Sequence, residues 1–308
     1  MPTFYTVAPI FVSLDIGAGS VEIAAGDRTD TVVEVRPANP ERKSDVAACE
    51  AARVEYHEGT LTVKTPRTWR QYVAWRDGGS VRVDIAVPSG SRVRGELGVG
   101  NLRTSGRLGD CVLKSGAGDV HVGEAGPVQV RSGAGDITVE SAMEHCEVSL
   151  GSGAVQVARV DGPAVVKNAN GDVRVGDVLG GLRATTANGR IWVGRAASDV
   201  EAKTANGSVR IDEVASGRVS ALTAMGKVEI GIRHGVAALL DVETSWGKVL
   251  NGLEASGPPA PGTPSVEVRA RTSFGDVRIF RSAGPDLPGP GGPRDVPGQP
   301  GPWEADRD

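Results

Sequence analysis

The chain has 308 residues and a formal net charge of −4, which is too small to indicate a polyanionic partner such as a nucleic acid. Hydrophobic residues make up 39% of the sequence but aromatic residues only 4%, so the core must be built from small aliphatic side chains, chiefly Val and Ile. The 43 glycines and 19 prolines indicate many turns, and the three cysteines, an odd number, do not indicate a disulfide framework.

The N-terminal segment, MPTFYTVAPIFVSLDIG, lacks the basic and long apolar regions of a signal peptide. No stretch of about 18 apolar residues occurs, so no membrane span is expected. We therefore predict a cytoplasmic protein, with the cell surface as the alternative location. Residues 11–23, FVSLDIGAGSVEI, place Val12, Leu14, Val21 and Ile23 at alternate positions around Gly19, which predicts two strands joined by a tight turn.

Residues 24–92 contain three strand-like stretches, TVVEVRP, ARVEYHEGTLTVKTP and SVRVDIAVP. A short helix is expected over residues 40–52, with Asn39 as its cap and Pro40 at its first position. The alternating frame of residues 11–23 stops here and resumes at Val93. Residues 1–92 are therefore predicted to form a β-rich cap on a repeat array.

From residue 93 to residue 282 one short unit repeats about ten times. Each unit contains an anchor glycine, and successive anchors are 17–21 residues apart until the last step of 28: Gly100, Gly118, Gly135, Gly153, Gly171, Gly189, Gly207, Gly226, Gly247 and Gly275. Apolar residues, mostly Val and Ile, stand two and four residues after the anchor and five and seven residues before it, with Asn251 as an exception. Each unit, here called a rung, is therefore strand, glycine turn, strand, second turn.

A rung of about 18 residues buries its apolar side chains only by stacking on its neighbours. We predict an all-β, single-stranded parallel β-solenoid in which every strand pairs with its copy in the next repeat, and both two and three faces fit the pattern. Residues 254–264, EASGPPAPGTP, are predicted to be an inserted loop. The Pro/Gly-rich tail, residues 283–308, is predicted to be disordered.

The glycine turns have three interpretations. A phosphate loop requires a helix after the glycines, and here a strand follows. A calcium-binding β-roll requires acids on successive rungs, and only Asp119 and Asp136 provide an adjacent pair, so no metal site is predicted beyond these two weak candidates. We favour an architectural role, in which Asn170, Asn188 and Asn206 hydrogen-bond along the rod and a Ser/Thr-rich column lies beside the turn.

The sequence predicts no catalytic residue and no cofactor. Its four histidines are scattered, and no HExxH, CxxC or GxSxG motif occurs. A stripe that includes Lys114, Arg131, Lys167, Lys203 and Arg271 is interrupted and predicts a solvated face rather than a nucleic-acid site. Cys111 and Cys146 stand two rungs apart, about 9.6 Å, which exceeds the roughly 7 Å that a disulfide allows, so they are predicted to be core residues.

Large apolar residues occupy the position before the anchor in the last three repeats. Met225, Trp246 and Phe274 stand where the repeats anchored at Gly118 to Gly207 have Ala, Ser or Asn. Stacked in register, they would form an apolar ridge. The ridge is either covered by the 254–264 loop or the tail, or it is a surface for a protein partner or for self-association.

The phrases KSGAGDVHV, RSGAGDITV and KNANGDVRV, with the opening FVSLDIGAGSVEIAAGDRTDTVVEVRP and the closing VEVRARTSFGDVRIFRS, resemble a bacterial β-strand-repeat family described as candidate adhesins, a family of unknown function. The resemblance covers residues 4–282. It implies a β-solenoid and, by the family's description, adhesion, and it supplies no catalytic residues. We predict a non-enzymatic scaffold or interaction protein, with a secreted or surface adhesin and a carbohydrate-active β-helix enzyme as alternatives, so carbohydrate is a further partner class to test.

Overall fold

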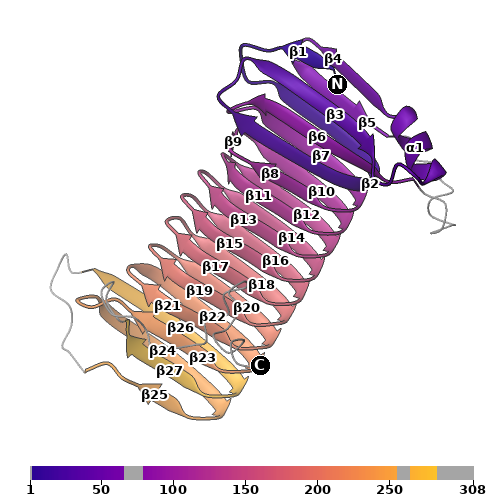
Figure 1. The fold of residues 1–308 in the computed structure, drawn as a ribbon. Helices are drawn as coiled ribbons and strands as arrows, with labels where there is room; N and C mark the ends of the chain where they lie inside the picture. The colour runs from indigo at the N-terminus through magenta and orange to yellow at the C-terminus, as the bar shows by residue number, and fades with distance from the viewer. Residues whose placement is uncertain (1, 66–78, 255–263, 283–308) are drawn as a thin grey trace, which may run out of the picture.

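The computed structural model describes residues 2–65, 79–254 and 264–282, and the chain winds into a rod of stacked rungs (Figure 1). Each rung gives one strand to each of two parallel sheets, which we name sheet A and sheet B, and the apolar side chains lie between them. The fold is therefore a β-solenoid with two main faces, which confirms the predicted fold class. The one helix of the described residues is short and lies at the N-terminal end.

Sheet B is formed by the strand before each glycine turn, and the long strand β2 contributes its first half to this sheet. In spatial order from the N-terminal end, its parallel strands are β5 (Thr60–Lys64), β2 (Phe11–Gly26), β7 (Arg92–Val99), β10 (Cys111–Ala117), β12 (Val128–Ala134), β14 (Cys146–Ser152), β16 (Ala164–Asn170), β18 (Leu182–Asn188), β20 (Val200–Asn206), β22 (Gly217–Met225), β26 (Ser265–Phe274) and β24 (Ala237–Trp246).

Sheet A is formed by the strand after each glycine turn. In the same order its parallel strands are β6 (Val81–Pro88), the second half of β2, β8 (Leu102–Ser105) with β9 (Arg107–Leu108), β11 (Val120–Ala125), β13 (Ile137–Ala142), β15 (Val155–Val160), β17 (Val173–Val178), β19 (Ile191–Ala196), β21 (Val209–Val214), β23 (Val228–Ile232), β27 (Val277–Arg281) and β25 (Val249–Asn251).

The core consists of columns of small aliphatic side chains that run along the rod. Val122 and Val139, for example, lie opposite each other in neighbouring rungs, and both are fully buried. The buried core of the described residues contains no Phe, Tyr or Trp. Because β-branched side chains pack well on a pleated surface and each rung covers the next, a chain poor in aromatic residues still forms a continuous core.

The N-terminal end holds one more rung than the sequence predicts. As expected, β2 places Val12, Leu14, Val21 and Ile23 in the core. The expected break in the frame between residues 23 and 93 is wrong, because β5 and β6 both pair in parallel with β2 and form a rung outside it. The period is hidden because residues 65–80 separate these two strands in the sequence.

Three antiparallel strands close this end of the rod (Figure 1). They are β3 (Asp30–Pro37) against β6, β4 (Arg53–His57) against β5, and β1 (Thr3–Tyr5) against β3. The division of the chain into an N-terminal cap and a repeat array stays a prediction, as do the boundaries at residues 92 and 282.

The helix, α1 (Lys43–Glu50), begins three residues after the expected Pro40, and its N-cap is Arg42 rather than Asn39. The side chain of Asn39 instead accepts the Glu41 N–H at 2.9 Å in a local turn. The buried carboxylate of Asp45, inside the helix, accepts the N–H of Asn39 at 3.1 Å. These bonds to Asn39 hold the residues before Lys43 outside the helix.

At the C-terminal end the rungs do not stack in chain order. Strand β26 pairs with β22 on one side and with β24 on the other, so the last repeat lies between the two that precede it in the sequence. The expectation that each repeat stacks on the next is wrong at this point, and β24 with β25 forms the end of the rod (Figure 1). The 254–264 loop, apart from its two end residues, and the tail from residue 283 lie outside the described residues.

Candidate interaction site

The glycine turns share one backbone conformation, and the residue after the glycine can hydrogen-bond to the next rung. Gly118 and Gly135 have φ of 117° and 109°, a conformation that side-chain-bearing residues rarely adopt. The Asp119 carboxylate accepts the backbone N–H of Asp136 at 2.9 Å, and the Asp136 carboxylate accepts the N–H of Ala154 at 2.8 Å. The two acids weighed as calcium ligands therefore bind the backbone of the next rung. Within residues 2–65, 79–254 and 264–282 no group of three or more His, Cys, Asp or Glu side chains is placed to hold a metal ion.

Side-chain ladders tie each corner to its neighbour. The Thr204 hydroxyl donates to the carbonyl oxygen of Gly189 at 3.0 Å, and the equivalent Thr or Asn repeats this bond in adjacent rungs. Asn206 donates to the Asn188 side-chain oxygen at 2.8 Å, and Asn188 donates to Asn170 at 2.8 Å. The predicted architectural role of these two ladders is confirmed.

Ion pairs between rungs occupy the outer faces of the sheets. On sheet B, Lys114 and Arg131 of the basic stripe lie 3.1 Å and 3.5 Å from Glu96 and Glu147. On sheet A, the Arg195 guanidinium donates a hydrogen bond of 2.6 Å to Asp177 and lowers the pKa of that carboxyl. The basic stripe is therefore divided by acids, as expected for a solvated face.

The cysteines are free in this structure. Cys111 and Cys146 are buried in one column with Val128 between them, and burial raises the pKa of each thiol to about 12. Cys49 on α1 is partly exposed. The prediction that the first two are core residues without a disulfide is confirmed.

The apolar ridge forms as the sequence predicts, but in a different order. Met225 lies opposite Phe274, and Phe274 lies opposite Trp246. The three side chains are 52%, 55% and 72% exposed. In the rungs before them the same corner column carries Asn206 and Asn188, so the column changes from an amide ladder to large apolar groups within one step.

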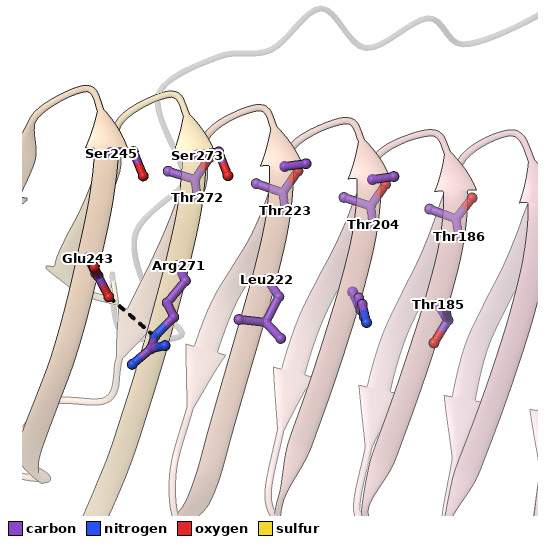
Figure 2. Close-up of a pocket in the computed structure, with 13 residues that line it drawn as sticks. Thr185, Thr186, Thr204, Leu222, Thr223, Glu243, Ser245, Arg271, Thr272 and Ser273 are labelled. Atoms are coloured by element: carbon purple, nitrogen blue, oxygen red, sulfur yellow. Dashed lines mark ion pairs between the residues drawn. The ribbon is translucent and has the colours of Figure 1, made fainter.

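An open groove of about 470 Å³ lies beside the ridge on sheet B. The buried threonines Thr186, Thr204, Thr223 and Thr272 line it in a row across four neighbouring strands (Figure 2). Its other lining residues are Thr185, Lys203, Ala205, Leu222, Ala224, Glu243, Ser245, Arg271 and Ser273.

Next to each ridge residue, the lining of the groove carries a small side chain. Ala224 precedes Met225, Ser273 precedes Phe274, and Ser245 precedes Trp246 in the sequence. Across the groove, the Arg271 guanidinium lies 3.7 Å from the Glu243 carboxylate (Figure 2). The sequence predicts the ridge but not the groove, because small residues stand at this position in the other rungs as well.

No helix of the described residues has the length and apolarity that a membrane crossing requires. The family model for Toastrack DUF4097 matches residues 11–280, and the chain therefore belongs to this family. No curated protein matches the chain.

Three solved structures are similar to it at low identity. One is a candidate cell adhesion protein from Clostridium sporogenes, at 11% identity and a TM-score of 0.24, covering 91% of this chain and 99% of that one. The second is a candidate lipid-binding protein from Parabacteroides distasonis, at 12% and 0.40, covering 91% and 96%. The third is a candidate adhesin from Bacteroides fragilis, at 11% and 0.31, covering 91% and 95%. Likenesses of this degree do not indicate what this chain binds.

Proposed function

We propose that this member of the Toastrack family is a non-enzymatic interaction protein, in which the solenoid is a rigid scaffold and the ridge of Met225, Phe274 and Trp246 is the contact surface for a protein partner. The observation that carries the proposal is the exposure of three large apolar side chains, in register, on neighbouring rungs. Exposed apolar patches of this kind mark interaction sites on soluble proteins.

The surroundings of the ridge fit a protein interface. Aromatic side chains are enriched among the residues that dominate binding energy, and they act where a surrounding rim excludes water. Here Lys203, Arg271 and Glu243 lie across the groove and provide charged groups for such a rim. The ridge would supply the apolar centre of the interface, and the groove would receive side chains of the partner.

The composition of the groove favours binding over hydrolysis. A glycosidase places two carboxyl groups on either side of the scissile bond. The only acid among the lining residues of this groove is Glu243, which forms an ion pair with Arg271. This supports the non-enzymatic part of the proposal. A carbohydrate-active enzyme stays an alternative, and hydrolysis of a glycan that is lost on Glu243→Gln would favour it.

The test compares two substitutions in the same corner column. Trp246→Ser removes the most exposed ridge residue, at 72%, and the matched control Val99→Ser removes an apolar side chain that is 55% exposed near the other end of the rod. Both variants are expected to remain folded and soluble. Quantitative pull-down from the native cell should recover a partner with the wild type and with Val99→Ser that is lost with Trp246→Ser.

Two results would contradict the proposal. The same proteins recovered with all three chains would show that the ridge is not the contact surface. Loss of soluble folded protein with Trp246→Ser alone would show that the ridge is a covered part of the fold. The intracellular location stays a prediction, and cell fractionation that places the chain at the surface would favour the adhesin alternative.

A further inference from the structure

The two ends of the rod are finished differently. At the N-terminal end, β3 and β4 pair antiparallel with the outermost parallel strands of both sheets. At the other end, β24 and β25 each have one partner strand among the described residues, β26 and β27 respectively. Among residues 2–65, 79–254 and 264–282, the C-terminal end therefore presents one strand edge from each sheet.

The backbone groups of β24 that face away from β26 follow from the hydrogen-bond pattern of a parallel sheet. In a parallel sheet, a strand directs the backbone groups of alternate residues to opposite neighbours. The N–H of Ala237 donates to Pro264 at 3.0 Å, toward β26. Leu240 and Val242 belong to the alternate set, so their N–H and C=O groups face away from β26.

The anchor glycines direct their N–H groups toward the C-terminal end of the rod. Throughout the rod, the N–H of each anchor glycine donates to the next rung, as Gly226 does to Phe274 at 2.9 Å and Gly275 does to Trp246 at 2.9 Å. Gly247 is the anchor of the last rung, and no further rung of the described residues lies beyond it to accept its N–H. An edge with aligned unpaired donors and acceptors is a template for another strand.

The core columns are also open at this end. Val249 is 47% exposed, whereas Val277, which lies opposite it in the neighbouring rung, is fully buried. Leu240 and Val242 are only partly buried, although they stand in columns that are buried elsewhere. An added strand that places small apolar side chains at alternate positions would complete these columns.

Strand β26 shows what kind of strand β24 accepts. Its sequence, SVEVRARTSF, alternates Val and Ala in the core with Arg outside. Arg269 lies 3.0 Å from Asp241, and Arg271 lies 3.7 Å from Glu243. The two carboxylate side chains nevertheless remain 50% and 68% exposed.

Charge favours a basic strand over a second copy of this chain. A second β24 added in register would place Asp241 beside Asp241 and Glu243 beside Glu243, and directly opposed like charges destabilise a pair of strands. A strand with Arg or Lys at these positions would instead extend the ion pairs that β26 already forms.

We propose that the open end formed by β24 and β25 binds an extended segment of a partner protein by parallel strand addition, and that the segment alternates small apolar residues with Arg or Lys. This interaction uses backbone groups and Glu243 rather than the ridge. Glu243 also belongs to the charged rim proposed for the ridge interface, but the ridge side chains take no part in strand addition, so Trp246→Ser tests the first proposal and the peptide experiment tests the second.

The experiment measures binding of a labelled peptide to the full chain by fluorescence anisotropy. The probe is SVEVRARTSF, the sequence of Ser265–Phe274. Saturable binding is expected, and the peptide SVEVEAETSF, in which both arginines are replaced by Glu, should bind roughly tenfold more weakly because two cross-strand charge pairs become repulsive. Glu243→Lys should reduce this preference or invert it. The matched control Glu201→Lys lies on β20, which is paired on both sides, and should leave it unchanged.

Two further peptides test the backbone geometry without changing the protein. N-methylation at the two Arg positions removes the N–H groups that would face β24, and it should abolish binding. N-methylation at the Val and Ala between and before them removes groups that face away, and it should leave binding intact. If the full chain shows no saturable binding, the proposal is wrong. This includes the case in which residues 283–308 or a second copy of the chain occupy the edge and exclude the peptide. Binding that is indifferent to the site of N-methylation or to Glu243→Lys would also overturn it.

Discussion

Replacing Gly135 by Ala tests whether the corners require glycine for steric reasons. A Cβ on Gly135 would lie 2.5 Å from the carbonyl carbon of Gly118 in the preceding rung, and the φ of Gly135 is 109°. Ala pays about 1–2 kcal/mol for a left-handed conformation, and relieving a clash with a fixed backbone costs about 1–3 kcal/mol more. We expect Gly135→Ala to lower the free energy of unfolding by roughly 2–5 kcal/mol.

Equilibrium unfolding in urea, followed by circular dichroism, measures this change as a lower transition midpoint with an unchanged slope. The matched control is Gly181→Ala in the second turn, where the nearest atom to an added Cβ is the Asp199 carbonyl oxygen at 3.8 Å and φ is not in the left-handed region. That variant should change stability by less than about 1 kcal/mol. If Gly135→Ala is no more destabilising than Gly181→Ala, the rungs are freer to separate than this reasoning allows.

Two further predictions concern ionisable groups. Because the hydrogen bond from Arg195 lowers the pKa of Asp177 below its ordinary value of 3.8, Arg195→Gln should raise that pKa and cost stability. The loss should be constant near neutral pH and shrink as pH falls below about 4, because Asp177 is protonated first in the unfolded chains and only at lower pH in the folded wild type; a difference that is equal at pH 7 and pH 3 would contradict this linkage. Burial raises the pKa of Cys111 and Cys146 to about 12, so a thiol reagent at pH 8 should label Cys49 first and the two core thiols only on unfolding, as peptide mass spectrometry would show.

The repeated part of the fold could be predicted because each rung contains the residues that determine its two strands and its turn. Alternation on both sides of an anchor such as Gly189 fixes two strands and a turn, and a column such as Val122 and Val139 fixes the register between rungs. The same local rule made the Asn ladder predictable, since Asn188 and Asn206 stand at one position of successive repeats. Prediction succeeded wherever the repeat length left one way to stack.

The prediction failed where strands that are neighbours in the stack are not consecutive in the sequence. The strand pairs β5–β6 and β26–β27 occupy positions in the stack that differ from their positions in the chain. Local patterns do not encode this order, because every rung presents nearly the same apolar columns to its neighbours. The start of α1 was also misplaced, since Asn39 and Pro40 are typical of a helix start, whereas the buried carboxylate of Asp45 binds Asn39 and sets the actual path.

The corner column shows why the ridge is a better candidate for function than the glycine turns. Asn188 and Asn206 each hydrogen-bond to a neighbour in the column, so an amide at this position stabilises the stack. Met225 and Trp246 make no such bonds through their side chains among the described residues, and both expose most of their surface. The fold alone does not explain why exposed apolar side chains replace the hydrogen-bonded Asn in this column, because the same backbone carries Asn a few rungs away. Contact with a partner would explain these side chains, because burying their apolar surface in an interface would stabilise the complex.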